Sequence, residues 1–247
     1  MAEQTTGEIN NESGATKRVL TIFAHPDDAE FSCGGTIARW AAEGHHITIC
    51  VVTNGDRGSD DPDMTPAQLA ETRFVEQWEA ARILGVQDVV FLGRQDGTVM
   101  PDLDLRRDLT RVVRRVRPDI VILGDPGIRY YGTEYINHPD HNAVAEAALG
   151  AVFPSAGNRL YFPELLIERL EPIKIKEIYM SNPAEPETWI DVSDYMETKI
   201  NALRAHKCQM GDWDPNDMVR EWNAEDGKKC DPPVAYAEDF RRFQTSG

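Results

Sequence analysis

Two short segments of the sequence concentrate side chains that can bind a metal ion or carry a proton. The first is AHPDDAE, in which His25 and Asp28 stand three positions apart, with Asp27 between them. If a helical turn begins at Pro26, the side chains of His25 and Asp28 point to one side of it. Catalytic zinc sites take three ligands from His, Asp, Glu or Cys and keep one position for water. A carboxylate beside such a site can accept a proton, so Asp27 is a candidate general base.

The second segment, INHPDHNAVAEAALGA, repeats the same chemistry. His138 and His141 stand three positions apart in it. Asn137 or His138 can cap a helix that begins at Pro139. Either segment alone could be no more than a capped helix start, whose acidic residues complement the helix dipole. Three of the six histidines of the chain fall in the two segments, and this coincidence indicates a site rather than two caps.

Both segments follow apolar runs of strand length. The predicted strands cover 18–24, 46–53, 88–92, 119–123, 177–180 and 189–192, and the predicted helices cover 31–43, 66–84, 105–116, a segment from 139, and a segment from 193 or 194 to 210. Strands that alternate with helices predict an α/β fold, a Rossmann-like three-layer sandwich with a mostly parallel sheet and helices on both faces. Ligands of such sheets bind beyond the carboxyl ends of the strands, which is where both segments lie.

The composition supports a single globular domain. Residues 18–247 form one predicted domain, and 1–17 form a predicted disordered tail without the apolar stretch of a secretory signal. The net charge of −16 argues against a nucleic-acid partner. No apolar run approaches the roughly 20 residues that span a bilayer. The four cysteines form no CxxC pair, which argues against a disulfide framework or a thiolate zinc site and makes the cytoplasm the expected location.

Other motifs of small-molecule enzymes are incomplete. Gly34 and Gly35 lack the G-x-G-x-x-G spacing of a dinucleotide site. The loop after the second predicted strand has no P-loop lysine, and no G-x-S-x-G elbow occurs. Paired carboxylates alone would suit a glycosidase, but the adjacent histidines favour a metal site.

The segments AHPDDAE and HPDH resemble the LmbE-like (PIG-L) family of zinc-dependent N-deacetylases. Three further stretches are similar to the same family, namely VVTNGDRGS, ETRFVEQWEAARILGV and FLGRQDGTV. Together they extend the resemblance over most of the chain. Within the helical stretch, Arg73 is either the family's helix arginine or the surface partner of Glu76. Cys208, where the family often has a serine, departs from the pattern.

The resemblance implies a metal centre and the residues that use it. It assigns His25, Asp28 and His141 as the ligands of one Zn²⁺ per chain. Another divalent ion stays open as an alternative, because His and Asp suit several. The resemblance also implies that Asp27 is the general base that takes a proton from water. His138 would stabilise the tetrahedral oxyanion or protonate the leaving amine.

Three more residues receive roles from the resemblance. Asp140 would orient a histidine from behind, which tunes the affinity and basicity of a metal site. Arg57 and Asp96, in the loops after the second and third predicted strands, would bind the hydroxyl groups of a sugar. The resemblance also makes a homo-oligomer an expectation, and an N-acylated sugar is the expected partner.

The expected activity is metal-dependent deacetylation. The enzyme would hydrolyse the N-acetyl amide of an N-acetylglucosamine-type sugar or glycoside and release acetate and a free amine. One alternative is an amidase that acts on a thiol conjugate or another N-acyl metabolite through the same metal site. A second alternative is a non-catalytic, metal-dependent sugar-binding module, although binding alone does not need a general base at Asp27. The sequence leaves open the aglycone and the length of the acyl chain.

Overall fold

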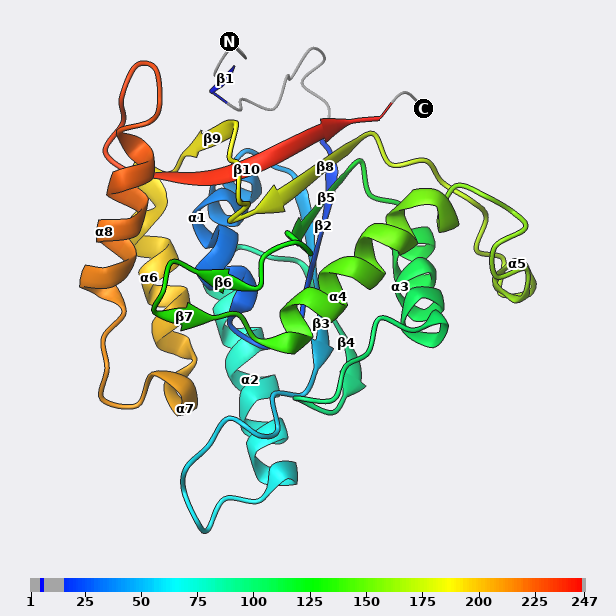
Figure 1. The fold of residues 1–247 in the computed structure, drawn as a ribbon, viewed down its shortest axis with the longest axis horizontal. Coiled ribbons are helices and arrows are strands. Elements are labelled where there is room, and N and C mark those ends of the chain that lie inside the picture. Colours follow the sequence, from blue (N-terminus) through cyan, green and yellow to red (C-terminus); the bar gives the residue numbers. More distant parts are fainter. Residues whose placement is uncertain (1–4, 7–15, 246–247) are drawn as a thin grey trace.

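The computed structural model describes residues 5–6 and 16–245. In this part of the chain, the main sheet has eight strands in the order β1-β9-β10-β8-β5-β2-β3-β4 (Figure 1). These strands are β1 (Thr5–Thr6), β2 (Arg18–Phe23), β3 (His46–Thr53), β4 (Asp88–Arg94), β5 (Ile120–Gly124), β8 (Glu177–Ser181), β9 (Thr188–Asp191) and β10 (Ala237–Gln244). Neighbouring strands run parallel except at β10, which is antiparallel to β8 and β9. The predicted mostly parallel sheet is confirmed.

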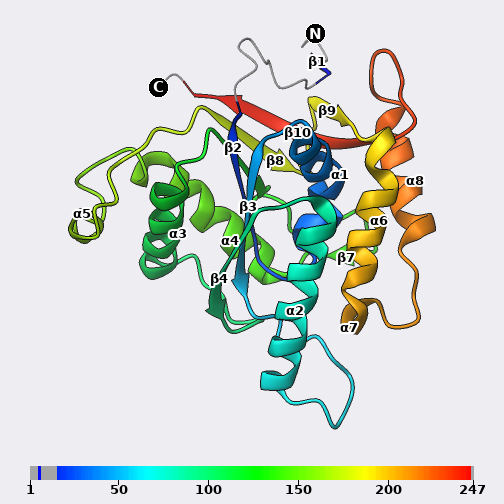
Figure 2. The ribbon, with the colours of Figure 1, turned by 180° about the vertical axis from the view of Figure 1, so that it is seen from behind.

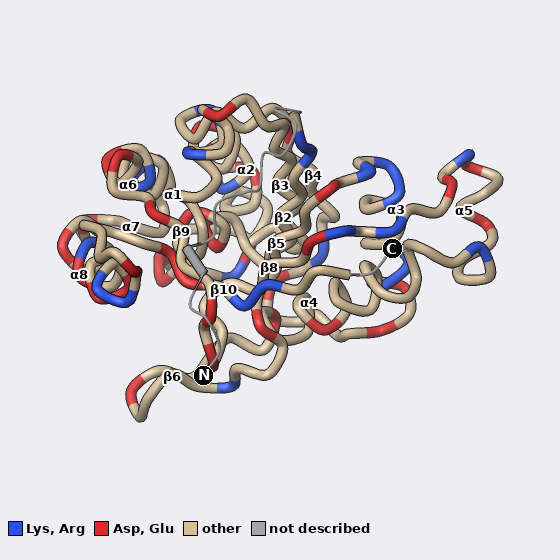
Figure 3. Tube along the Cα trace, turned by 90° about the horizontal axis from the view of Figure 1, so that it is seen from above, with Lys and Arg blue, Asp and Glu red and all other residues tan. Residues whose placement is uncertain are grey.

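Helices cover both faces of this sheet. They are α1 (Asp28–Ala42), α2 (Pro66–Leu84), α3 (Leu103–Val116), α4 (Pro139–Gly150), α5 (Glu164–Ile167), α6 (Met196–Ala205), α7 (Lys207–Met210) and α8 (Asn216–Gly227). Helices α1, α2 and α6 pack together on one face (Figure 2), whereas α3 and α4 pack together on the other. Figure 3 shows the sheet from above, between α1, α2 and α6 on one side and α4 on the other. The predicted three-layer α/β sandwich is therefore confirmed.

The central strand β2 explains why the layers form. Val19 and Phe23 join the buried cluster beneath α1, α2 and α6. Leu20 and Ile22 point the other way, into the buried cluster beneath α3 and α4. A strand with apolar side chains on both faces is stable only when both faces of its sheet are covered.

The strands that follow β2 in the sequence are added first on one side of β2 and then on the other. Strands β3 and β4 lie on one side of β2, and β5 lies on the other. The loops that follow β2 and β5 therefore leave neighbouring parallel strands at the same edge. This is the switch point at which open α/β sheets bind ligands. The two segments with candidate metal ligands, around His25 and around His138, begin in these loops.

The predicted cap and start of α2 are confirmed, whereas the helix predicted near the C-terminus is not continuous. Thr65 caps α2 in a reciprocal capping box with Gln68. The helix predicted to end at 210 is interrupted at His206, where the backbone leaves helical geometry (φ −80°, ψ 59°). The side chain of His206 turns into the interior and is fully buried. Strand β10 is not predicted from the sequence, because its charged residues break the apolar alternation.

Most of the predicted N-terminal tail, 1–17, lies outside the described residues. Among the helices in the described ranges, none is long and apolar enough to cross a membrane.

The buried carboxylate of Glu238, on β10, joins α1 and α6. The backbone of α1 is non-helical at Cys33 (φ −149°), so a second helical segment begins there. Its amides at Gly35 and Thr36 donate hydrogen bonds of 2.9 and 2.7 Å to the carboxylate of Glu238. The Nζ atom of Lys199, on α6, lies 2.7 Å from the same carboxylate. Both charged residues are only 1% exposed, so Glu238 caps the helix and neutralises Lys199 at once.

Loss of the Glu238 carboxylate should strongly destabilise the fold. We expect Glu238→Ala to lower the free energy of unfolding by about 3–5 kcal/mol, because it leaves a buried ammonium group unpaired. Equilibrium unfolding in urea measures this change. The matched control is Glu79→Ala, which breaks an exposed ion pair with Arg82 and should leave the unfolding midpoint close to that of the wild type. Equal midpoints for the two variants would refute the structural role of Glu238.

Candidate functional site

The loops after β2 and β5 bring three donor groups together. The Nδ1 atom of His25 lies 3.3 Å from Oδ2 of Asp28 and 3.2 Å from Nε2 of His141. The Oδ1 atom of Asp28 lies 3.1 Å from the same Nε2 atom. Ligand atoms about 2.0–2.1 Å from a tetrahedral zinc ion stand roughly 3.3–3.4 Å from one another. The donor set and its spacing therefore fit a metal ion.

Two carboxylates hold the other ring nitrogen of His25. Its Nε2 atom lies 3.0 Å from Oδ1 of Asp96 and 3.5 Å from Oδ2 of Asp140. The Asp140 carboxylate is fixed in turn, because it accepts hydrogen bonds from the amides of Gly97 and Val99 at 2.7 and 3.1 Å. A carboxylate behind a metal-binding imidazole sets its tautomer and its orientation. This arrangement leaves Nδ1 of His25 directed at the other two donor groups.

His141 is oriented by a residue that the sequence suggested only as a helix cap. The side-chain oxygen of Asn137 lies 2.8 Å from Nδ1 of His141. The side-chain nitrogen of Asn137 donates to the carbonyl of Ile128 at 2.9 Å, so its amide has a defined orientation. The cap of α4 is His138 rather than Asn137. Asn137 therefore directs Nε2 of His141 toward Asp28.

The site attracts positive charge. Burial by itself lowers the pKa of His25, but Asp28, Asp140 and Asp96 oppose it and raise this pKa to about 12. The pKa of His141 is also raised, because Asp28 outweighs the effect of burial. Both shifts favour the positively charged form of the two imidazoles beside Asp28.

Asp27 lies beside the cluster in a strained conformation. It precedes α1 with φ 101° and ψ −25°, in the left-handed region that non-glycine residues rarely adopt. Such strain is often kept where the position of a side chain matters. Burial raises the pKa of Asp27 to about 6, although the positive charge of Arg73 opposes this shift. Asp27 is therefore ionised at neutral pH, and its pKa lies only slightly below neutral pH.

Arg73 holds Asp27 in place from helix α2. Its guanidinium is 3.2 Å from Oδ2 of Asp27 and also donates to the carbonyls of Pro26 and Gly55. A Cβ atom at Gly55 would lie 2.4 Å from this guanidinium, so only glycine allows the contact. Arg73 is 3% exposed, and the suggested surface pair with Glu76 is therefore wrong.

Three buried polar residues continue inward from Asp27. The side-chain oxygen of Gln77 accepts a hydrogen bond from the amide of Asp27 at 3.2 Å, and its nitrogen donates to Glu30 at 2.7 Å. The Nε2 atom of His206 lies 3.6 Å from the other oxygen of Glu30. Neither Glu30 nor Gln77 is among the site residues predicted from the sequence. The spacing of four between Arg73 and Gln77, on the face of α2 that also buries Leu69, was the available signal.

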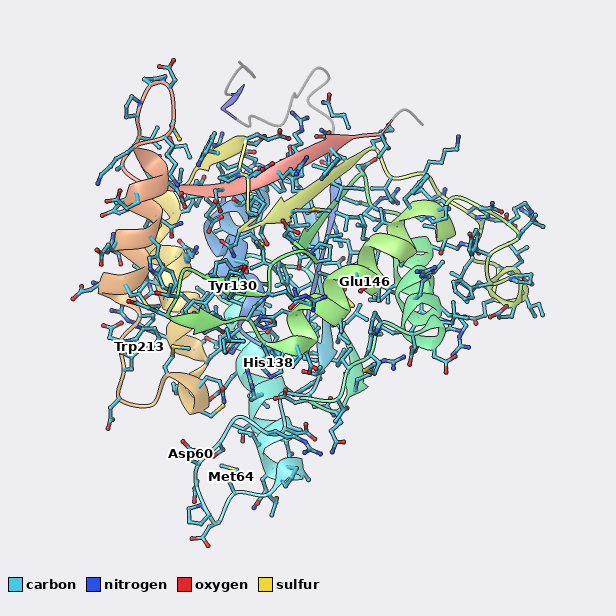
Figure 4. All side chains as sticks on the ribbon, viewed as in Figure 1. Asp60, Met64, Tyr130, His138, Glu146 and Trp213 are labelled. Atoms are coloured by element: carbon cyan, nitrogen blue, oxygen red, sulfur yellow. The ribbon has the colours of Figure 1, made fainter. Side chains whose placement is uncertain are left out.

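His138 lies at the mouth of the site, at the start of α4 (Figure 4). Its side chain is 38% exposed, and its ring meets that of His25 edge-on with centroids 4.6 Å apart. Burial lowers the pKa of His138, and the charge on His25 lowers it further, so the imidazole is neutral at neutral pH. Its Nδ1 atom accepts from the amide of Asp140, which leaves Nε2 to carry the proton.

A second group of donor atoms overlaps the first. Atoms of His25, Asp96, His138 and Asp140 also lie within 4.8 Å of one another. Both oxygens of Asp140 already accept backbone hydrogen bonds. The group that contains Asp28 and two facing nitrogens is therefore the better metal site.

The two predicted sugar-binding residues differ in position. Arg57 is exposed, next to Gly97 at the rim of the site. The side chain of Asp96 is only 9% exposed, with Oδ1 directed at His25. Their contact with a sugar stays a prediction.

Zinc binding to the metal-free protein should release protons. The metal ion must displace protons from His25 and His141, whose pKa values are raised. Calorimetric titration with Zn²⁺ near neutral pH, in buffers of different ionisation enthalpy, measures their number. We expect about one or more protons per bound ion, and weaker binding as the pH falls. Zinc binding without any proton release would contradict this charge assignment.

Comparison with known proteins identifies the family. The family described as GlcNAc-PI de-N-acetylase (PIG-L) matches residues 20–152. The chain is 32% identical to a diacetylchitobiose deacetylase of Thermococcus kodakarensis over 215 residues, which cover 87% of this chain and 77% of the relative. It is 30% identical to a 1D-myo-inositol 2-acetamido-2-deoxy-alpha-D-glucopyranoside deacetylase of Saccharomonospora viridis, with 78% and 85% of the two chains covered.

Solved structures agree with this family. The N,N'-diacetylchitobiose deacetylase from Pyrococcus horikoshii superposes with a TM-score of 0.87 at 29% identity, over 96% of this chain and 87% of that one. GalB, a 4-carboxy-2-hydroxymuconate hydratase from Pseudomonas putida, has a TM-score of 0.75 at 23% identity and shares the fold alone. With the family match across half of its length and these relatives, the chain belongs to the PIG-L family of GlcNAc-PI de-N-acetylases.

Proposed function

We propose that this enzyme hydrolyses the N-acetyl amide of an N-acetylglucosamine-type sugar or glycoside, with a zinc ion held by His25, Asp28 and His141. The observation that carries the proposal is the convergence of three donor atoms beside the ionisable carboxylate of Asp27. Relatives named as deacetylases of acetamido sugars support the substrate class. Two imidazoles and one carboxylate are a common catalytic zinc set. Zinc bound there would polarise the amide carbonyl and lower the pKa of water.

The chain's own residues would move the protons. Asp27, ionised at neutral pH, accepts a proton from the attacking water as its oxygen bonds to the amide carbon. Arg73 and Gln77 hold Asp27 in position for this step. The neutral imidazole of His138 donates a hydrogen bond from Nε2 to the developing oxyanion. The proton that Asp27 took from water passes to the amine nitrogen as the carbon–nitrogen bond breaks. The products are acetate and a free amine.

Other residues would position these groups and the sugar. Asp140 holds His25 in the orientation that a metal ion needs. Asp96 supports the same ring through Oδ1, and we assign its Oδ2 to a hydroxyl group of the sugar. Arg57, exposed at the rim, would donate to another hydroxyl.

We also propose a cytoplasmic location, a homo-oligomeric state and no nucleic-acid partner. The last of these is supported by the net charge of −16.

A substrate panel tests the activity directly. The zinc-loaded protein is incubated with N-acetylglucosamine, N-acetylated glycosides, N-acyl thiol conjugates and N-acyl amino acids, and primary amines and acetate are measured. We expect release from the N-acetylated sugars. Turnover confined to the thiol conjugates would favour the alternative amidase, and tight sugar binding without any turnover would favour a binding module.

Replacement of Asp27 should remove the base and keep the metal. We expect Asp27→Asn to lower kcat by roughly 10²–10⁴-fold, the usual contribution of general acid–base catalysis. In the wild type, kcat/KM should fall as the pH drops through the pKa of Asp27, at or below about pH 6, because the protonated carboxyl cannot accept a proton. Rates are measured by acetate release and zinc by mass spectrometry. An unchanged rate in the variant would rule out Asp27 as the base.

The two histidines of the second segment should behave differently. His141→Ala should lose bound zinc, since His141 supplies a donor atom of the cluster. His138→Ala should keep its zinc while its kcat falls by about 10²-fold or more. Metal content after dialysis against buffer separates the two roles. Full zinc content in His141→Ala would overturn its assignment as a ligand.

A further inference from the structure

An aromatic hairpin stands next to the site without a role in the proposed reaction. Strands β6 (Tyr130–Tyr131) and β7 (Tyr135–Ile136) form it, between β5 and the second histidine segment. It projects from the body of the protein in Figure 3. Its base is fixed, because the amide of Asn137 donates to the carbonyl of Arg129 at 3.0 Å. The hairpin is therefore attached to the residue that orients His141.

The register of the hairpin separates its four large side chains into two faces. Tyr131 is paired with Tyr135, and Tyr130 with Ile136. Paired residues share a face of a two-stranded sheet, and successive residues alternate between faces. The rings of Tyr131 and Tyr135 lie 6.0 Å apart. Tyr130 and Ile136, on the opposite face, are 70% and 85% exposed.

The position of Tyr131 identifies the face of the hairpin that is directed toward the site. It lines a cavity together with two of the proposed metal ligands, Asp28 and His141. The cavity has a volume of about 60 Å³. Pockets that enclose a drug-sized ligand measure roughly 300–1,000 Å³, so this cavity suits a substituent of a sugar rather than a whole sugar ring. A sugar ring would then lie at the mouth, beside Tyr131 and its neighbour Tyr135.

Polar groups line the same cavity at the ends of β5 and β8. Asp125 accepts hydrogen bonds from the amides of Gly127 and Ala184, at 2.8 and 3.4 Å, so it holds the two loops together. Asn182 and Ser32 also line the cavity. Asn182 has a φ of 47°, in the left-handed region that non-glycine residues seldom adopt and that often marks functional positions. Amide and hydroxyl groups in one cavity with an aromatic side chain suit the polar edges and apolar faces of a carbohydrate.

We propose that Tyr131 and Tyr135 form one wall of a second sugar subsite, which binds the ring attached to the N-acetylated residue. Asn182, which lines the same cavity as Tyr131, binds a substituent of that ring. This inference rests on the proposed function and specifies its substrate as a disaccharide or a glycoside with a ring-shaped aglycone. The relatives named as diacetylchitobiose deacetylases support a substrate of this size.

The two faces of the hairpin supply a matched pair of variants. Tyr135→Ala removes an aromatic ring from the site-facing wall, and Tyr130→Ala removes the same ring from the opposite face. Amine release is measured with N,N'-diacetylchitobiose and with N-acetylglucosamine. We expect Tyr135→Ala to lower kcat/KM for the disaccharide about tenfold, mainly through KM, as for the loss of one aromatic contact of about 1.4 kcal/mol. The value for the monosaccharide should change less than about twofold, and Tyr130→Ala should leave both values near the wild type.

Several results would overturn the subsite. Equal losses on both sugars in Tyr135→Ala, or equal losses in the two variants, would exclude a wall specific for the second ring. A change of mass in light scattering that accompanies the loss would instead make the hairpin a contact between copies of the chain. Asn182→Ala provides an independent check, since it should also impair the disaccharide selectively.

Failure of the proposed function can be distinguished from failure of the subsite. If the zinc-loaded wild type releases amine from neither sugar, the deacetylase proposal fails. Calorimetric binding of chitobiose, which lacks acetyl groups, then tests the subsite by itself. Weaker binding to Tyr135→Ala than to Tyr130→Ala would support it, and equal or absent binding would overturn it.

Discussion

Negative charge gathered around one imidazole is the constraint on which the rest of the site depends. Asp28, Asp96 and Asp140 all face His25. Partly buried carboxylates in such number are costly unless positive charge offsets them. The fold reduces this cost by placing the residues at the carboxyl ends of neighbouring parallel strands, where backbone amides donate to Asp140. The protein therefore holds the donor groups for a cation in position through contacts that do not involve the cation.

The surrounding helices extend this arrangement by fixing each reactive group from behind. Arg73 and Gln77, on one face of α2, hold both the side chain and the amide of Asp27. Asn137 does the same for His141 from the loop before α4. Because these supports are side chains packed on rigid helices or bound to backbone groups, the reactive atoms stay close to their working positions.

The parts of the structure that could be predicted are those with a local signal. The apolar strands, the capped start of α2 and the two histidine segments all follow from neighbouring residues, and the parallel sheet brings the segments together. Arg73 could not be placed in this way, because burial of an arginine depends on a carboxylate 46 positions away and on the absence of a side chain at Gly55. Strand β10 could not be predicted from the sequence for a similar reason. Its charged residue Glu238 is buried against partners that lie far away in the sequence.

The cap that Glu238 provides also has a consequence for the order in which the protein is assembled. A ribosome makes the chain from its N-terminus, so α1 is synthesised 203 residues before the carboxylate that caps its second half at Gly35. Until then, this carboxylate can neither accept hydrogen bonds from the amides of that segment nor neutralise the ammonium group of Lys199. The helix that begins at the site can therefore reach its final form only after β10 has been made and has entered the sheet, although local strands and helices form earlier. The segment AHPDDAE is translated before β10, and the support of its helix is complete only when β10 has joined the sheet.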